Sequence, residues 1–177
     1  MSDTQRALSG PGVQPYRFRA DFPPGTVVFL IGMRVNELRR VDQWLPVFRA
    51  MPKMIRELMQ QPELGLLGAE NWARWRQTLA VQYWRDMDHL MRYATARESE
   101  HLPAWAEFNR RARSSHAVGI WHEAYEVQPE TSHIVYRDMP LFGMGKSTAA
   151  MRVEHMPPQP VRRRGKDPDE SDLVVTG

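Results

Sequence analysis

The order in which strand-like and helix-like hydrophobic patterns follow one another constrains the fold of this chain more than any other feature. A continuous apolar run over residues 26–35 is typical of a strand buried on both faces. A long stretch of helical spacing comes next, followed by strand-like runs over 64–74 and 76–84. A second helical stretch begins after Asp86, and a last strand-like run covers 118–127. The predicted order is β-α-β-β-α-β.

The first helical stretch is marked by apolar residues three and four positions apart. They are Val41, Trp44, Leu45, Phe48, Met51, Ile55, Leu58 and Met59. Asn36 is the predicted N-cap, and Gln61-Pro62 marks the predicted end. Pro46 and Pro52 lie inside the pattern, so we expect the helix to be kinked or divided there.

The second helix is predicted to begin at Asp86 as N-cap, with its buried stripe formed by Met87, Leu90, Met91 and Ala94. A further helical piece is predicted over 102–113. A short extra strand over 132–139 and a glycine-containing loop over 140–146 complete the ordered part.

This order predicts an α+β fold, a ferredoxin-like βαββαβ sandwich with both helices on one face of an antiparallel sheet. The opposite face would still carry aromatic and aliphatic side chains, and a soluble monomer rarely exposes so large an apolar surface. We therefore expect two copies to pair their sheets face to face in a homodimer, forming a dimeric α+β barrel.

The two ends of the chain differ in composition from the middle. Residues 1–24 are rich in Gly, Pro, Ser and Arg and predict a disordered N-terminal arm. Residues 152–177 predict a disordered charged tail, in which Arg162-Arg163-Arg164 is followed at once by acidic residues. The packed domain is expected over 25–151.

Composition excludes several classes of protein. The absence of cysteine rules out disulfides, thiolate metal sites and cysteine nucleophiles. The longest apolar run, residues 27–31, is far shorter than the ~20 residues of a membrane span. With no apolar signal-peptide core at the N-terminus, a cytoplasmic protein without a membrane partner is expected. The net charge of +3 comes from arginines scattered among acids, which favours a solvated surface over nucleic-acid binding.

Several short motifs carry a resemblance to a known family. They are VFLIGMRVN (28–36), WLP (44–46), MP (51–52), PELG (62–65), QYW (82–84), HLPAW (101–105), FNR (108–110), GIWHE (119–123) and MPLFG (139–143). In these segments the chain resembles a family of small bacterial and fungal proteins described as monooxygenase-like, within the dimeric α+β-barrel superfamily. The resemblance spans nearly the whole predicted core.

The resemblance implies two kinds of chemistry. Antibiotic-biosynthesis monooxygenases of this superfamily oxidise polycyclic or polyene natural products, often without a metal or a flavin. Haem enzymes of the superfamily, such as aldoxime dehydratases, use an axial histidine. The expected cofactor is therefore none, with haem b as the alternative.

Two histidines are the strongest candidates for chemistry. His101, Trp105 and Phe108 share one face of the predicted 102–113 helix, where His101 would be a pocket base, a haem ligand or a helix-start histidine bound by a backbone carbonyl. His122 lies in the middle of the last strand and shares its face with Ile120 and Ala124. There it is a base, an axial haem ligand or a structural histidine.

The opposite face of that strand offers Trp121 and Glu123. Because His122 and Glu123 point to opposite faces, they are not expected to chelate one metal ion together with His101. The tryptophans Trp84, Trp105 and Trp121 are assigned either to the core or dimer interface, or to an aromatic-tolerant substrate cavity.

The leading hypothesis is a small monooxygenase-like enzyme acting on an apolar aromatic or polyene metabolite. His101 or His122 removes a substrate proton, the carbanion reduces dioxygen, and Arg34 holds charge. The expected substrate-binding residues are Trp105, Trp121, Phe108, Trp84 and Glu123. The alternatives are a haem enzyme of the aldoxime-dehydratase kind, with His122 or His101 as axial ligand, and a non-catalytic ligand-binding dimer.

Overall fold

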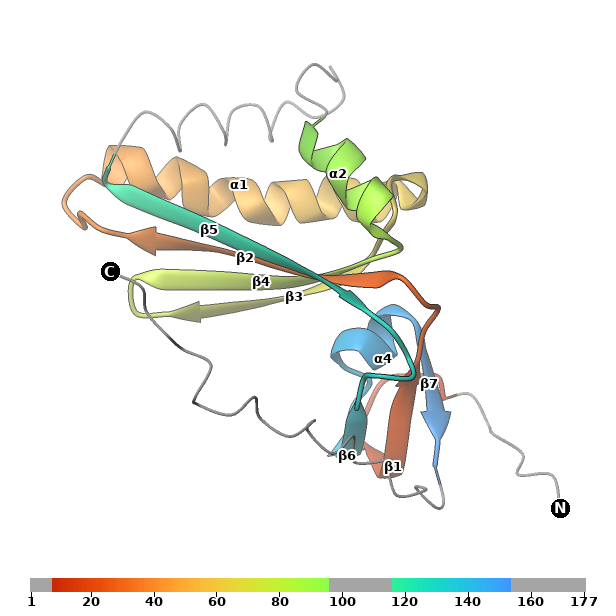
Figure 1. Cartoon of the computed structure of the whole chain (residues 1–177). Helices are drawn as coiled ribbons and strands as arrows, with labels where there is room; N and C mark the ends of the chain where they lie inside the picture. The colour runs from red at the N-terminus through yellow and green to blue at the C-terminus, as the bar shows by residue number, and fades with distance from the viewer. Residues whose placement is uncertain (1–7, 96–115, 154–177) are drawn as a thin grey trace, which may run out of the picture.

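A four-stranded antiparallel sheet and two helices on one of its faces form the larger part of the molecule (Figure 1). A computed structural model describes residues 8–95 and 116–153. The sheet order is β3-β4-β2-β5. The strands are β2 (Thr26–Val35), β3 (Leu66–Arg74), β4 (Gln77–Trp84) and β5 (Val118–Val127). The helices are α1 (Val41–Gln60) and α2 (Met87–Thr95), with a short 3-10 turn, η1 (Pro62–Leu64), between α1 and β3. This arrangement confirms the predicted α+β ferredoxin-like fold.

The register of β2 decides which side chains face the helices. Alternate residues of β2 face α1 and α2. Val27 and Phe29 belong to one cluster of core residues there, and Met33 and Val35 belong to a second. Ile31 continues this face and stands opposite Ala80 of β4 and His122 of β5. Since paired residues of antiparallel strands point to the same side, one helix-covered face can be followed across the sheet.

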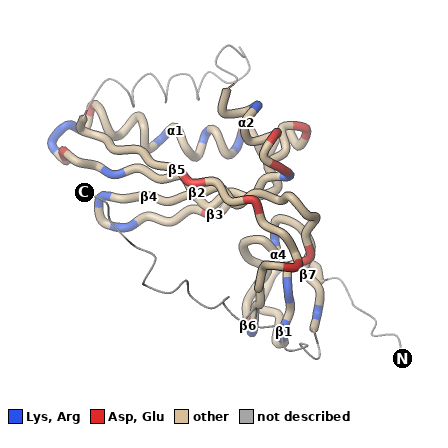
Figure 2. The backbone as a smooth tube through the Cα atoms, viewed as in Figure 1, with Lys and Arg blue, Asp and Glu red and all other residues tan. Residues whose placement is uncertain are grey.

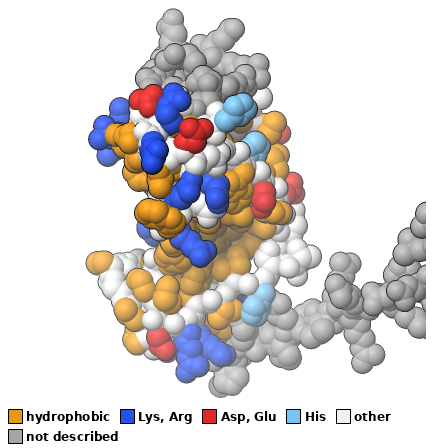
Figure 3. Space-filling model, turned by 90° about the vertical axis from the view of Figure 1, so that its left-hand side faces the viewer, with side chains coloured by type: hydrophobic (Ala, Val, Ile, Leu, Met, Phe, Trp, Pro, Cys, Tyr) orange, Lys and Arg blue, Asp and Glu red, His pale blue; other side chains and the backbone are white. Residues whose placement is uncertain are grey.

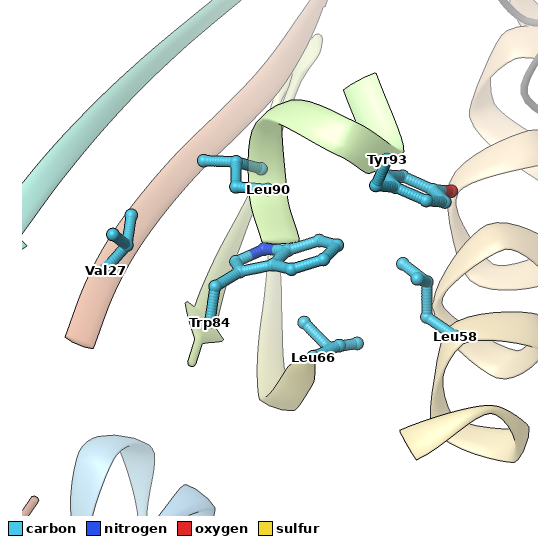
Figure 4. Packing of buried hydrophobic residues seen from close by; sticks show 6 residues of the cluster. All are labelled: Val27, Leu58, Leu66, Trp84, Leu90 and Tyr93. Carbon is cyan, nitrogen blue, oxygen red and sulfur yellow. The ribbon is translucent and has the colours of Figure 1, made fainter. Parts of the chain in front are cut away.

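The core lies between this face and the helices. Figure 4 shows six residues of its main cluster converging from the sheet, α1 and α2: Val27, Leu58, Leu66, Trp84, Leu90 and Tyr93. The indole of Trp84 is fully buried, its ring centroid lies 5.4 Å from that of Tyr93, and its Nε1–H donates to Gln82 Oε1 over 2.9 Å. The indole N–H of Trp84 is thereby satisfied inside an apolar cluster.

Helix α1 ends before Gln61, as the sequence predicts, and it is not divided at Pro46 or Pro52. Its predicted start is wrong, because the helix begins at Val41 and no side chain caps it. Asn36 instead donates from Nδ2 to the backbone oxygen of His116 over 3.0 Å. This bond ties the end of β2 to the residues that lead into β5.

Helix α2 begins as predicted. The Asp86 carboxylate accepts the backbone N–H of His89 over 2.8 Å, which is the expected N-cap bond. The same oxygen lies 2.7 Å from His89 Nδ1. The backbone N–H and the side chain of His89 lower the pKa of Asp86. None of the helices in the described part of the chain is long and apolar enough to span a membrane.

A second, three-stranded sheet of order β6-β1-β7 was not predicted. It consists of β1 (Gln14–Asp21), β6 (Val135–Met139) and β7 (Ala149–Arg152), with the short helix α4 (Gly143–Ser147) between β6 and β7. The prediction of a disordered arm over 1–24 is therefore wrong for residues 14–21. Phe18 is fully buried and stacks on Tyr136 with ring centroids 4.7 Å apart.

Two boundaries near the C-terminus also change. The predicted loop over 140–146 contains most of α4, and β7 carries the fold one residue past the predicted limit at 151. The guanidinium of Arg152 lies 4.5 Å from the ring centroid of Tyr16, which fixes the last strand against the first. The remainder of the predicted tail, from 154, lies outside the described residues.

Within residues 8–95 and 116–153, the face of the large sheet that points away from α1 and α2 is covered at one end only. There α4 packs on β3: Ser147 lies against Gly68, Lys146 Nζ is 3.1 Å from Glu70 Oε1, and the Phe142 and Trp72 rings meet edge to face. Further along, this face presents Leu30, Leu79, Val81, Trp121 and Tyr125. Of the apolar face expected from the sequence, α4 and the residue before it cover one end, and the other described elements leave the remainder uncovered.

Candidate functional site

A cavity of about 220 Å³ lies between α1 and the β3, β4 and β2 part of the sheet. Its wall is formed by Ile31, Gly32, Met33, Val47, Phe48, Met51, Pro52, Asn71, Trp72, Ala73, Thr78, Leu79 and Ala80. Most of these residues are apolar, which is the usual lining of a small-molecule site. The exposed side chains of Asn71 and Ala73 show that it opens to solvent along the edge strand β3.

The cavity exists because small residues stand where the sheet faces α1. Ala73 is paired with Thr78, and Asn71 is paired with Ala80, so each pair across β3 and β4 includes an alanine. On the opposite wall, Pro52 lacks the backbone N–H that would otherwise bond the Phe48 carbonyl within the helix. These features keep the two layers from filling the space between them.

Two polar side chains stand in the apolar wall. Asn71 and Thr78 come from neighbouring strands and are diagonal to one another in the register. Within the described residues neither the Asn71 amide nor the Thr78 hydroxyl has a side-chain hydrogen bond. Both the Asn71 amide and the Thr78 hydroxyl can donate and accept hydrogen bonds, so both are available to a bound molecule.

Smaller hollows adjoin the cavity at both ends. Towards the β3–β4 hairpin, a space of about 160 Å³ is lined by Leu38, Trp44, Arg74, Arg76 and Gln77 and shares Met33, Phe48, Ala73 and Thr78 with the main cavity. Towards α2, a space of about 20 Å³ shares Ile31 and Met51 with it and reaches Gln82 and Tyr93. The hollows form one line beneath α1.

His122 lies on the helix-covered face of β5. It stands opposite Ile31, which lines the main cavity, and its ring centroid is 5.8 Å from that of Phe29. His122 itself is exposed and lines none of the cavities described above. The other predicted histidine and its helix partners, His101, Trp105 and Phe108, lie outside the described residues.

The structure does not bring the other predicted site residues to this cavity. Trp121 and Glu123 lie on the opposite face of β5, where Glu123 accepts a 2.6 Å hydrogen bond from the Tyr125 hydroxyl. Arg34 shares that opposite face and is exposed. Trp84 belongs to the buried core.

A metal centre finds no support in the described part of the chain. No group of three or more His, Asp or Glu side chains lies close enough there to hold an ion. The register places His122 and Glu123 on opposite faces of β5, as the alternation along this strand predicts.

Sequence reasoning missed Asn71, Thr78, Arg74 and Arg76. A weak signal was present in the alternation of β4, which places Thr78 on the same face as Ala80 and Gln82. Polar and small residues among larger apolar ones on a helix-covered face indicate space rather than packing. The sequence does not show which face of β4 the helices cover, so it does not show that Thr78 lies beneath α1.

The chain is similar to several solved structures at low identity. SnoaB, a cofactor-independent oxygenase from Streptomyces nogalater, is 12% identical with a TM-score of 0.43, over 59% of this chain and 94% of that chain. An aldoxime dehydratase (OxdRE) in complex with butyraldoxime is 14% identical with a TM-score of 0.49, over 85% of this chain and 42% of that one. A dimeric protein of unknown function and ferredoxin-like fold from Bacteroides fragilis is 13% identical with a TM-score of 0.43, over 60% of this chain and 100% of that one.

The family of the chain is given by its sequence. No curated protein matches it. Residues 26–144, which run from β2 into α4 and include every element that lines the cavity, match the family described as monooxygenase af470-like. Because the match covers more than half of the chain, this protein belongs to the monooxygenase af470-like family.

Proposed function

We propose that this protein is a small oxidoreductase of the monooxygenase type that oxidises an apolar aromatic or polyene metabolite in the cavity beneath α1. Membership of the family supports an oxygenase-like or oxidoreductase-like function in general terms. The single observation that carries the finer proposal is the apolar cavity with Asn71 and Thr78 in its wall. Such a wall favours an apolar body and orients it by a few polar contacts.

His122 is the proposed base. It lies on the same face of the sheet as the cavity, one strand away, with Ile31 between its strand and the cavity. A substrate longer than the cavity would extend across Ile31 towards the imidazole. His101 stays a second candidate from the sequence, outside the described residues.

The proposed reaction needs a substrate carbon whose C–H bonds are acidified by neighbouring aromatic rings or a carbonyl group. The imidazole of His122 takes one proton, and the carbanion gives electrons to dioxygen as a C–O bond forms. The imidazolium then returns the proton to the peroxide oxygen, which gives a hydroperoxide and restores the base. Loss of water from the resulting hydroperoxide leaves a carbonyl, so that CH₂ and O₂ become C=O and H₂O. A hydrogen bond from the Asn71 amide to the substrate oxygen that gains charge would stabilise the carbanion.

Haem is the alternative cofactor, and its fit can be tested on the cavity. A haem enzyme of this kind needs an axial ligand facing the haem. No histidine lines any of the three spaces described above, and His122 is exposed beside Phe29. The described cavity therefore offers no axial ligand and does not fit a haem.

A homodimer is part of the proposal. The face of the sheet opposite the helices carries Leu30, Leu79 and Val81, with 41% of Trp121 and 51% of Tyr125 exposed. Apolar surface of this extent favours a partner, and a second copy placed face to face would cover it.

The experiment that tests the function is oxygen uptake by the purified full chain. Dithranol, a tricyclic aromatic ketone with an acidified methylene group, serves as probe, with its spontaneous oxidation subtracted. We expect enzyme-dependent uptake of one O₂ per ketone formed. No uptake above the blank with dithranol or with a polyene probe would contradict the oxygenase and favour a non-catalytic ligand-binding dimer. A strong Soret band in the absorption spectrum would instead favour the haem enzyme.

A further inference from the structure

We infer that the molecule bound beneath α1 carries an anionic oxygen group, such as a carboxylate, held at the end of the cavity that is lined by Arg74 and Arg76. This inference deepens the proposed function, because it concerns the substrate of the same cavity. It rests on the observation that the main cavity and the smaller space near the β3–β4 hairpin adjoin and differ in polarity. One is apolar, and the other has two arginines, Arg74 and Arg76, among its lining residues.

The two spaces are continuous in their walls. Met33 and Phe48 belong to both, as do Ala73 and Thr78 at the β3–β4 side. A molecule with its body beside Asn71 therefore reaches the arginines without leaving the groove between α1 and the sheet. The body and the anion would occupy the two parts of one groove.

Arg76 is fixed in place by the fold. It has a positive φ of 63° in the β3–β4 turn, and its Nε–H donates to the Val35 carbonyl over 2.8 Å. A second guanidinium nitrogen donates to the Asn36 carbonyl. Both bonds go to neutral carbonyl groups, so the positive charge is held in position and is not neutralised.

Arg74 supplies the second charge. Its Cβ lies on the face of the sheet opposite Ala73, so its long side chain reaches the smaller space around the end of β3. Arg74 ends β3, is exposed, and has no ion pair with any of the described residues. It lines the smaller space together with Trp44 and Leu38, whose contact is fixed by a 3.0 Å hydrogen bond from Trp44 Nε1 to the Leu38 carbonyl. An arginine beside apolar side chains can pair with a carboxylate in a bidentate way.

The surroundings strengthen the positive potential. Figure 2 shows basic residues in the β2–α1 connection and in the β3–β4 hairpin, which lie at the same end of the molecule. Figure 3 looks onto this end, where basic and hydrophobic side chains are interspersed. The basic residues there are Arg34, Arg39, Arg40, Arg74 and Arg76, and the acidic ones are Glu37 and Asp42. Asp42 lies 3.6 Å from Arg40. Within the described residues no acidic side chain lines either space.

An anchored anion would also serve the reaction. The anion is bound at one end of the groove, away from the carbon from which His122 takes the proton. Binding energy gained at such a remote group orients the reacting carbon. A neutral apolar molecule would gain nothing from the two guanidinium groups.

The test compares two fluorescent probes with the same ring skeleton. These are 8-anilinonaphthalene-1-sulfonate, which carries an anion, and N-phenyl-1-naphthylamine, which does not. We expect Arg74→Gln to weaken binding of the sulfonate by about threefold to tenfold and to leave binding of the neutral probe unchanged. Added salt should weaken only the sulfonate complex. Arg137→Gln, at an exposed arginine of β6, is the control and should change neither.

A second variant places the probes in the groove. Ala73→Trp puts a large side chain into the wall shared by both spaces, and we expect it to weaken binding of both probes. Equal binding of the two probes, an equal loss of both in Arg74→Gln, or no effect of Ala73→Trp would overturn the inference. Because no turnover is measured, a charge-selective groove without oxygen uptake would contradict the proposed function and leave this inference standing.

Discussion

His122 stands directly opposite Ile31 across the β5–β2 pair, and Ile31 lines the cavity beneath α1. Paired residues of antiparallel strands have their Cβ atoms roughly 5 Å apart on the same face. The imidazole is therefore a near neighbour of the cavity without being part of its wall. Of the predicted site residues that the structure describes, His122 is the one that shares the cavity's face and borders it.

Replacing His122 tests its role as base. We expect His122→Ala to lower the rate of dioxygen uptake by about 10²- to 10⁴-fold, because a positioned base contributes that much to proton transfer. The side chain is exposed, so the thermal midpoint should change little. His133→Ala, at an exposed histidine before β6, is the matched control. Full turnover in His122→Ala would show that the base lies elsewhere.

Asn71 is expected to act on the charge that develops in the substrate. Asn71→Leu keeps the branched shape and the number of side-chain heavy atoms but removes the amide, and we expect kcat for dioxygen uptake to fall about 10- to 100-fold, at or below the lower end of the range for a lost donor. Asn71→Asp keeps the size and replaces the donor by a negative oxygen, so its kcat should be at least as low. Wild-type turnover in both variants would exclude this role.

The order of strands and helices was predictable because the apolar residues within each of these elements recur with the spacing of a strand or of a helix. The second sheet was not, because β1 gains its partners only from distant parts of the chain: Gln14 pairs with Met139, and Phe18 pairs with both Tyr136 and Arg152. Tyr16, Phe18 and Ala20 alternate with polar residues. The prolines and glycines around them obscured this short pattern.

The candidate site was predictable only in part. Alternation along β5 separated His122 from Trp121 and Glu123, and the structure confirms that separation. Which of the two faces the helices cover depends on how the elements are connected in space. In the sequence, a lone polar residue such as Asn71 in β3 looks like a residue that faces solvent. Only the position of α1 shows that it lines a cavity.

The proposed dimer predicts a monomeric variant. Val81 is half-buried near the middle of the face opposite the helices, beside Leu30. Val81→Arg would place a charge between two copies, and we expect sedimentation velocity to show the mass of one chain in place of two. Met59→Arg is the control, since Met59 is 54% exposed on α1, and it should stay dimeric. A wild-type chain that sediments as a monomer would contradict the dimer.

Two strand glycines form a matched pair for stability. A Cβ on Gly32 would lie 2.6 Å from the backbone oxygen of Thr78 and 2.6 Å from Nε1 of Trp121, whereas a Cβ on Gly119 would meet nothing closer than 3.6 Å. We expect Gly32→Ala to lower the free energy of unfolding by about 1–3 kcal/mol, because the backbone of β4 has to move. Gly119→Ala should leave it unchanged or raise it by up to about 1 kcal/mol. Urea denaturation measures both, and equal values would contradict the close packing over Gly32.

Two phenols that contact α4, those of Tyr83 and Tyr136, are expected to make the free energy of unfolding depend on pH in the alkaline range. The Tyr136 hydroxyl accepts the backbone N–H of Gly145 over 3.2 Å, and the Tyr83 hydroxyl lies against Gly143. Burial, with smaller contributions from Tyr136 and Glu70, raises the pKa of Tyr83 from 10.0 to about 12, and burial also raises the pKa of Tyr136.

Because the folded chain holds the Tyr83 proton more tightly than the unfolded chain, its contribution to stability is complete below pH 10 and is lost as the pH rises towards 12. We expect the free energy of unfolding of Tyr83→Phe to fall less steeply over this range than that of the wild type, and Tyr136→Phe to change the slope in the same direction. Urea denaturation at intervals of pH measures the slope. Parallel curves for wild type and Tyr83→Phe would show that the phenol is as accessible to water in the folded chain as in the unfolded one.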